Sequence, residues 1–271
     1  MNIGIIGFGV VGKAVAKTFS RQNKIIKYDK FSSYDKFSDL EKCDFIFITV
    51  PTPFDCEDNK TDTSAVFNSL ERLEKLNFRN IVVIKSTLPP GTCDKYIPKF
   101  NYRIIYNPEF LRESIDPNKD FAEQDTIVIG AENKKDFENT KRLYQEIAVP
   151  NAEYYYTTHK EAEMIKCAQN TMLASRVALA NMIFDACEKN NINYEIVREI
   201  AFDRFQILGP HMVQVPGPDG KRGFGGKCLP KDIRLFSSIY QSRLLNEIIS
   251  YNDTLRDDLE NFLVNFKKGM K

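Results

Sequence analysis

The sequence predicts an α/β fold over residues 1–155 and an all-α domain over residues 156–271. In the first part, short apolar segments alternate with helical patterns, which is typical of a parallel sheet covered by helices. After about residue 158 this alternation stops, and residues 159–190 form one long helical pattern without glycine or proline. We therefore expect a doubly wound parallel sheet followed by a helical domain.

The individual elements follow from where the apolar and helical patterns begin and end. Strands are predicted at Ile3–Ile6, Ile25–Tyr28, Phe45–Val50, Ile81–Ile84, Arg103–Tyr106, Thr126–Ile129 and Glu153–Tyr156. Besides the long one, helices are predicted at Val10–Ser20, Ser64–Leu76, Lys134–Ile147, Tyr194–Ala201 and about Asp232–Phe266, the last broken near Tyr240–Ser242. A glycine-rich loop is predicted at Gly209–Lys227.

Composition and charge argue against several function classes. With 38 basic and 37 acidic residues, the net charge of +1 gives no basis for binding nucleic acid or an anionic membrane. No apolar segment approaches the roughly 18–20 residues that span a bilayer, and the N-terminus does not resemble a signal peptide. The six cysteines include no CxxC pair, and together with two histidines they offer no zinc-type spacing. We expect a metal-free protein in a reducing, cytosolic compartment.

Residues 7–12 read GFGVVG, a GxGxxG pattern directly after a predicted strand and at the start of a predicted helix. The first glycine allows a tight turn, the second lets the backbone approach a pyrophosphate, and the third lets the helix pack on the strand. The free N–H groups of the helix N-terminus then bind the phosphates. The residues predicted to contact the dinucleotide are Gly7, Gly9, Val11 and Gly12. The alternative is an α/β domain with a fortuitous glycine turn.

Asp29 ends the second predicted strand, 17 residues after Gly12. A carboxylate at this position accepts hydrogen bonds from the ribose hydroxyls of adenosine. It also repels a 2′-phosphate, so NAD is favoured over NADP. The neighbouring Lys30 weakens this preference slightly.

Hydroxyl side chains follow two further predicted strands. Residues 49–53 read TVPTP and residues 85–87 read KST. Both segments lie at the carboxyl ends of strands, where ligands bind in open α/β sheets. Proline-rich turns that end strands account for Pro51 and Pro89 but not for the hydroxyl residues, so we include both segments in the predicted cofactor site.

Two pairs of polar residues have the i,i+4 spacing that places side chains on one face of a helix. Glu109 and Glu113 form the first pair, and their alternative role is a solvated helix start with acids near the positive end of the dipole. Lys166 and Asn170 form the second pair, among largely apolar residues of the long helix. A cation there needs a partner or a function, unless the lysine extends from the rim of the apolar face into solvent.

Cys228 follows a flexible glycine-rich segment, residues 223–226, and precedes a predicted helix start. Helix N-termini and nearby cations favour nucleophilic thiolates, and Lys227 and Lys231 supply positive charge. Asp232 lies four residues beyond the cysteine and is a candidate for proton transfer. The alternative is a small buried hydrophobic residue, as most lone cysteines are.

Together these segments resemble the UDP-glucose/GDP-mannose dehydrogenase family, in particular its UDP-glucose 6-dehydrogenase-like members. The matching segments occur in the family's order across about residues 1–256. They are GFGVVG, Asp29, VPTP, KSTLPPGT, NPEFLRES, EAEMIKCAQNTMLASRVALAN, VPGPDG and GFGGKCLPKD. The combination of GFGGKCLPKD with PEFLRE is highly specific for this family.

The resemblance implies a two-step, NAD-dependent oxidation of a sugar-nucleotide primary alcohol to the carboxylate, with UDP-glucose as the default substrate. Cys228 would attack the aldehyde from the first hydride transfer, and the thiohemiacetal would lose a second hydride to give a thioester that water cleaves. The other catalytic residues that the resemblance implies are Lys166 and Asn170 at the oxyanion, and Asp232, Thr87, Glu109 and Glu113 at the water. The implied nicotinamide contacts are Thr52, Thr87 and Glu113. The implied substrate contacts are Leu111, Arg112, Lys166, Asn170 and the loop Gly223–Gly226, including Gly225.

Two features depart from the family pattern. Members normally carry a third domain that holds much of the nucleotide, whereas this sequence ends at Lys271. The resemblance therefore implies a protein without the C-terminal nucleotide-binding domain, so that a partner chain completes the site or the sequence is a fragment. The family's Arg-Ile-Gly stretch is also out of register here, and either Arg204 or Gln206 takes the place of its arginine. Members dimerise through their central helices, so we expect a homodimer.

Two other functions stay open on the sequence. A single-step hydroxyacid dehydrogenase of the 6-phosphogluconate or 3-hydroxyacid type also has a Rossmann domain followed by helices with a Lys…Asn pair. Such an enzyme does not need Cys228. The third possibility is a truncated protein that binds a nucleotide without catalysis. Within the main hypothesis, UDP-N-acetyl hexosamines and GDP-mannose are the alternatives to UDP-glucose.

Overall fold

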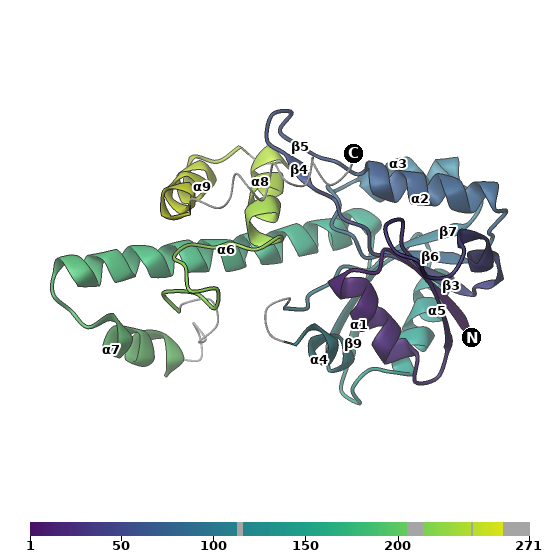
Figure 1. The fold of residues 1–271 in the computed structure, drawn as a ribbon, viewed down its shortest axis with the longest axis horizontal. Coiled ribbons are helices and arrows are strands. Elements are labelled where there is room, and N and C mark those ends of the chain that lie inside the picture. Colours follow the sequence, from purple (N-terminus) through teal and green to yellow (C-terminus); the bar gives the residue numbers. More distant parts are fainter. Residues whose placement is uncertain (113–115, 205–213, 240, 257–271) are drawn as a thin grey trace. The chain divides into compact units, whose positions relative to one another are not determined.

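The computed structural model describes the chain except residues 113–115, 205–213, 240 and 257–271 (Figure 1). The chain forms two compact units, one of residues 1–52 and 61–166 and the other of residues 53–60 and 167–271. The change from mixed to helical structure falls between Thr157, where the last strand ends, and His159, where the long helix begins. A functional domain boundary near residue 155 stays a prediction.

A seven-stranded sheet forms the centre of the first unit, with the order β2-β1-β3-β6-β7-β8-β9. Its strands are β1 Asn2–Ile6, β2 Lys24–Tyr28, β3 Phe45–Ile48, β6 Ile81–Ile84, β7 Arg103–Tyr106, β8 Thr126–Gly130 and β9 Glu153–Thr157. The first five strands of this order pair in parallel, and the strand order reverses between β1 and β3. Ligands bind at such a reversal point in doubly wound sheets. The predicted α/β fold is confirmed.

The sheet departs from the predicted parallel arrangement at one place. β8 runs antiparallel to β7, with Tyr106 opposite Gly130, and β9 is parallel to β8. Between β7 and β8 the described residues include the short helix α4, Pro117–Ala122, which packs on α1. Antiparallel neighbours need no crossover, whereas parallel neighbours do. The twelve-residue helix α5, Lys134–Gln145, supplies such a crossover from β8 to β9.

Two apolar clusters cover opposite faces of this sheet. One cluster includes residues of α2, Ser64–Lys75, and α3, Thr92–Tyr96, while the other includes residues of α1, Val10–Phe19, together with α4 and α5. Ile46 and Ile48 of β3 face the first cluster, and Phe45 and Phe47 face the second. Each such buried side chain stabilises the fold by about 1.5–3 kcal/mol. Burial on both faces explains why β3 is a continuous apolar run.

Beyond residue 166, the regular elements of the second unit are helices in its described part. The unit contains most of α6, His159–Lys189, which is 31 residues long, and α7, Tyr194–Arg198, which continues as a π-helical turn over Glu199–Asp203. Two more helices follow, α8 at Leu229–Ile239 and α9 at Arg243–Leu255. The predicted helix over 232–266 thus begins earlier and breaks where expected, while residues 257–266 lie outside the described residues. No described helix is long and apolar enough to cross a membrane.

A short hairpin that the sequence patterns did not predict follows the VPTP motif. Its strands are β4, Phe54–Asp55, and β5, Lys60–Thr61. Phe54 is buried with Cys167 of α6 and Leu235 of α8 in a small apolar cluster. Residues 53–60 therefore belong to the helical unit, whereas the first three residues of the motif belong to the first unit.

Candidate functional site

The turn between β1 and α1 explains the spacing of its glycines. Gly7 has φ +92°, a left-handed conformation that side chains other than that of glycine rarely adopt. A Cβ at Gly12 would collide with the carbonyl oxygen of Gly7 and lie 2.9 Å from Thr49 Oγ1. A Cβ at Gly9, by contrast, would meet no described atom within 4 Å. Gly7 and Gly12 thus shape the turn, whereas Gly9 leaves open the space in front of the α1 N-terminus, where a pyrophosphate fits.

Asp29 is held against this same turn. Its Oδ2 accepts a hydrogen bond from the Phe8 amide at 2.7 Å, and its Oδ1 accepts one from the Phe31 amide at 2.9 Å. Each carboxylate oxygen can accept a second hydrogen bond. The geometry therefore suits recognition of ribose hydroxyls beside the phosphate-binding turn, and these residues fit a dinucleotide cofactor.

The two hydroxyl-rich segments contact each other at the ends of β3 and β6. Thr52 Oγ1 donates to the carbonyl oxygen of Thr87 at 2.8 Å, and Ser86 Oγ donates to that of Val50 at 2.6 Å. Adjacent parallel strands bring these segments to one edge of the sheet. The structure therefore brings Thr52 and Thr87 together at the edge where the sequence predicts the nicotinamide end of the cofactor.

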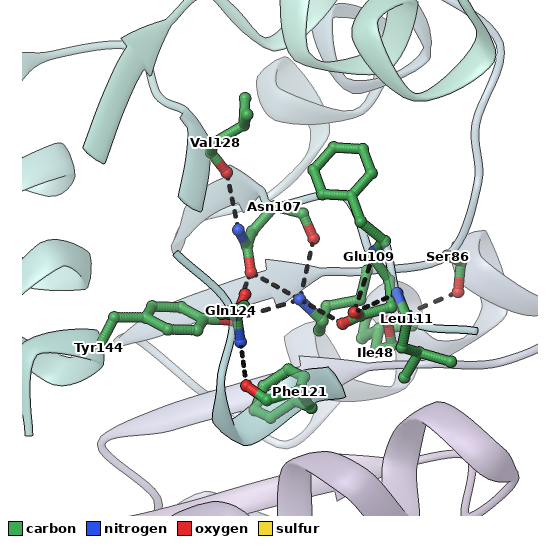
Figure 2. A network of polar contacts seen from close by, with 11 residues as sticks. Ile48, Ser86, Asn107, Glu109, Leu111, Phe121, Gln124, Val128 and Tyr144 are labelled. Carbon is green, nitrogen blue, oxygen red and sulfur yellow. Dashed lines mark hydrogen bonds and ion pairs between the residues drawn. The ribbon is translucent and has the colours of Figure 1, made fainter. Parts of the chain in front are cut away.

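A buried polar network lies next to this edge, and Figure 2 shows its members Asn107, Glu109 and Tyr144. Lys85 Nζ lies 3.0 Å from Glu109 Oε2 and donates to Asn107 Oδ1 at 2.7 Å and to Tyr144 Oη at 3.3 Å. Tyr144 also donates to Asn107 Oδ1, and Asn107 Nδ2 donates to Val128 O at 2.7 Å. Burial lowers the pKa of Lys85, while the Glu109 carboxylate opposes this change. The network joins β6, β7, β8 and α5 through fully enclosed polar groups.

The prediction that Glu109 and Glu113 lie on one face of a helix is wrong over residues 107–112, which are the described part of this segment. Residues 107–112 are not helical. Glu109 Oε1 instead accepts the amides of Phe110 at 3.0 Å and Leu111 at 3.1 Å, and such local side-chain bonds compete with helix formation. Glu109 is therefore a buried ion-pair partner of Lys85. Glu113 lies outside the described residues.

Two predicted substrate contacts near Glu109 have partners within the first unit. Leu111 is partly buried against the apolar cluster that includes α1. Arg112 forms a bidentate pair with Asp120, with Nε–Oδ2 at 2.9 Å and Nη2–Oδ1 at 2.7 Å. This hydrogen-bonded pairing lowers the pKa of Asp120. The guanidinium of Arg112 is thus engaged at the start of α4 in this structure.

Lys166 and Asn170, the predicted pair on α6, belong to different units. Lys166, the last residue of the first unit, is buried, and its Nζ lies 5.3 Å from the centre of the Phe110 ring. This geometry is a cation–π contact, and it brings Lys166 to the segment that carries Glu109. The structure therefore does not show a lysine that extends into solvent from a rim. Asn170 belongs to the second unit and is also buried.

In the second unit, Asn170 contacts Asp232, which lies four residues after Cys228. The Asn170 side-chain amide donates to Asp232 Oδ2, and Lys231 Nζ lies 2.6 Å from Asp232 Oδ1. Asp232 is fully buried, and its amide donates to the carbonyl oxygen of Cys228 at 2.8 Å, so the cysteine caps α8. Cys228 itself is exposed and is not the buried hydrophobic residue of the alternative reading.

The remaining candidates are Arg204, Gln206 and Gly225. Arg204 has an exposed ion pair with Glu199, with Nη2–Oε1 at 3.1 Å. Gln206 lies outside the described residues. A Cβ at Gly225 would come within 2.5 Å of Arg256 Cζ, so this glycine permits close approach of a buried arginine.

The sequence motifs do not identify Lys85 and Asn107 as partners of the predicted site residue Glu109. Lys85 and Asn107 were part of matched segments, but only the fold shows that they face each other across β6 and β7. A lysine at the end of the buried apolar strand 81–84 was the available signal, because a buried cation needs a partner.

Comparison with known proteins places the chain in a family. The NAD binding domain of the UDP-glucose/GDP-mannose dehydrogenase family matches residues 26–148, and the central domain of that family matches residues 160–254. The chain therefore belongs to the UDP-glucose/GDP-mannose dehydrogenase family. The first match identifies the α/β part as the family's NAD-binding domain.

The most similar proteins agree with this assignment. The UDP-glucose 6-dehydrogenase of Rickettsia felis is 33% identical over 225 residues, which are 79% of this chain and 48% of that protein. The chain thus spans about half the length of the curated relatives that it matches. A UDP-glucose dehydrogenase from Pyrobaculum islandicum has a TM-score of 0.82 at 23% identity and covers 93% of this chain and 68% of its own. The 3-hydroxyisobutyrate dehydrogenase of Mycobacterium tuberculosis has a TM-score of 0.71 at 12% identity over 94% of both chains, so the fold alone is shared more widely.

The two glycines of the β1–α1 turn provide a matched pair of variants. Gly9→Ala should weaken NAD binding while leaving the melting temperature nearly unchanged, because the added methyl group enters open space in front of the helix. Gly12→Ala should lower the melting temperature as well, because its methyl group collides with the Gly7 carbonyl. Fluorescence titration with NAD and thermal unfolding separate the two effects. Equal loss of stability in both variants would contradict this reading of the turn.

Proposed function

We propose that the protein oxidises the primary alcohol of a nucleotide sugar to the carboxylate with two equivalents of NAD, and that the sugar nucleotide is UDP-glucose. The observation that carries this proposal is the buried contact between Asn170 and Asp232, 62 residues apart, together with the Asp232 amide that donates to the carbonyl oxygen of the exposed Cys228. A one-step hydride transfer needs no such thiol. The name of the Rickettsia felis relative supports the choice of UDP-glucose.

The position of Cys228 supports a nucleophilic role. It caps the eleven-residue helix α8, whose positive N-terminal end stabilises negative charge on the sulfur. The thiolate adds to the carbonyl carbon of the aldehyde intermediate, and the resulting thiohemiacetal carbon still carries a hydrogen with its electron pair. NAD held at the β1–α1 turn and by Asp29 would supply the hydride acceptor for each of the two oxidations. After the second hydride leaves, water attacks the thioester, releases the carboxylate and returns the proton to the sulfur.

The other proposed catalytic residues stabilise negative charge on the reacting oxygen or activate the attacking water. Asn170 and Lys166 stabilise the oxygen that becomes negative during each step. Asp232 orients Asn170 through their hydrogen bond and takes a proton from the water, together with Thr87. Glu109 assists as a base, and its ion pair with Lys85 keeps the carboxylate oriented. Glu113 is assigned to the nicotinamide end and to the same water only through the family resemblance.

The proposed substrate contacts are Leu111, Arg112, Lys166, Asn170 and Gly225, each assigned through the family resemblance. Arg112 would have to leave or share its pair with Asp120 to bind a sugar nucleotide. That exchange is inexpensive, because exposed ion pairs contribute only about 0–1 kcal/mol.

We also propose that the protein is a homodimer that pairs through α6. The helix carries exposed apolar residues at Ile165, Met172 and Leu179, seven residues apart, with Met182 on the same face. Met172 is 64% exposed and Met182 is 52% exposed, which is unusual for large apolar side chains on a helix that packs on one side. Spacing by seven residues is typical of helices that pair along their length.

The dimer is tested by mass in solution. Light scattering should give twice the 31.2 kDa chain mass for the natural sequence. Met172→Lys combined with Leu179→Lys should give the monomer, because two charges would be buried in the interface. A monomeric mass for the natural sequence at micromolar concentration would refute the proposal.

The proposed reaction is tested by counting product. With NAD and UDP-glucose, two NADH should form for each sugar consumed. Cys228→Ser should abolish acid formation without changing NAD affinity, and Cys56→Ser, at the other exposed cysteine, should change neither. One NADH per sugar with full turnover would instead indicate a single-step dehydrogenase. NAD binding without turnover of any sugar nucleotide would indicate a nucleotide-binding protein without this activity.

A further inference from the structure

Three buried polar side chains contact the glycine-rich loop immediately before Cys228. Asn181 comes from α6 and is 1% exposed, Asn252 comes from α9 and is 0% exposed, and Arg256 follows α9 and is 7% exposed. All three bind backbone groups of residues 222–224. Buried polar groups are costly unless they are paired, so their concentration on one loop indicates a specific purpose.

Asn252 satisfies both backbone groups of Phe224. Its Oδ1 accepts the Phe224 amide at 2.7 Å, and its Nδ2 donates to the Phe224 carbonyl oxygen at 3.1 Å. The Phe224 side chain is buried with Ala174 and Ala178 of α6 and Ile233 of α8. The backbone and side chain of Phe224 are therefore fixed together, four residues before the cysteine.

Asn181 and Arg256 hold the residues on the N-terminal side of Phe224. Asn181 Oδ1 accepts the Gly223 amide at 3.1 Å, where Gly223 has φ +76°. Arg256 Nη1 donates to the carbonyl oxygens of Arg222 and Gly223, both at 3.4 Å. Its Nη2 pairs with Asp219 at 2.8 Å. The same guanidinium fills the space that a side chain at residue 225 would need, so a larger residue there would displace Arg256 from this position.

We propose that Asn181, Asn252 and Arg256 are positioning residues for Cys228. Glycine-rich backbone loses more conformational entropy on ordering than other backbone does, and these side chains offset that loss at the loop that leads into α8. An ordered loop keeps Cys228 in its capping position at the α8 N-terminus, where its sulfur is electrostatically favoured as a thiolate. The inference rests on the proposed function only in taking Cys228 as the nucleophile, since the reactivity of the thiol is measurable without any turnover.

The experiment measures the rate at which iodoacetamide alkylates Cys228 as a function of pH. All six cysteines lie in the described chain, and only Cys56 and Cys228 are exposed, so the work uses the Cys56→Ser background. Asn252→Ala should lower the alkylation rate near neutral pH about tenfold and move the pH midpoint up by about one unit. Arg256→Lys keeps the charge but loses the planar fork, so it should change both quantities in the same direction by less.

The control variant is Asp253→Asn, which alters the next residue of α9. Asp253 pairs with Arg234 and does not contact the loop, so its variant should keep the alkylation profile of the parent. Melting temperatures show that each protein is folded at the assay temperature. If Asn252→Ala does not fold, Arg256→Lys decides the question. Folded variants whose rate and pH midpoint match those of Asp253→Asn would overturn the proposal and leave the three residues a structural role alone.

The outcome is independent of the turnover experiment. A shifted alkylation profile without NADH formation from sugar nucleotides would support the positioning role while refuting the proposed reaction. Two NADH per sugar together with an unshifted profile would support the reaction and refute the positioning role.

Discussion

The ion pair between Lys85 and Glu109 is the constraint on which the functional edge of the sheet depends. The Lys85 side chain is fully buried and the Glu109 side chain is 9% exposed, so water contributes little to the stabilisation of either charge. Removing such charges from water costs several kcal/mol each, and only good geometry with further hydrogen bonds repays that cost. Asn107 and Tyr144 supply those bonds. These contacts therefore favour a single arrangement of the ends of β6 and β7. Ser86 and Thr87 directly follow Lys85 at the end of β6.

The helical unit also contains a buried charged residue that is stabilised by polar partners. Asp232 has no exposed surface and is stabilised by Asn170 and Lys231, and its bond to Asn170 connects α8 with α6. In both units, apolar clusters determine which elements pack together, while buried polar contacts determine the local geometry of the functional segments. Satisfied polar networks in a low-dielectric interior are well suited to this, because alternative arrangements leave groups unpaired.

The sequence predicted the fold well where burial alone decides the structure. The segments 81–84 and 103–106 are strands with the predicted bounds, because runs of four and three consecutive buried residues leave little ambiguity. The direction of β8 and the β4–β5 hairpin were missed, because both depend on partners distant in the sequence. Phe54 of the hairpin, for example, packs with Leu235 of α8. The segment after Asn107 was expected to be helical from its spacing, but Lys85 draws Glu109 into a buried pair that spacing does not encode. Likewise, the contacts of Asn181 and Asn252 with the glycine loop join residues that only the tertiary structure brings together.

The most direct test of this account is a double-mutant cycle on the buried pair, with Lys85→Met, Glu109→Gln and the double variant compared in urea unfolding. Each single variant should lose about 3–5 kcal/mol of unfolding free energy, because it leaves a buried charge without its partner. The double variant should lose clearly less than the sum, with a coupling on the order of 1–3 kcal/mol. Additive losses, with a coupling near zero, would contradict the claim that this ion pair organises the functional edge of the sheet.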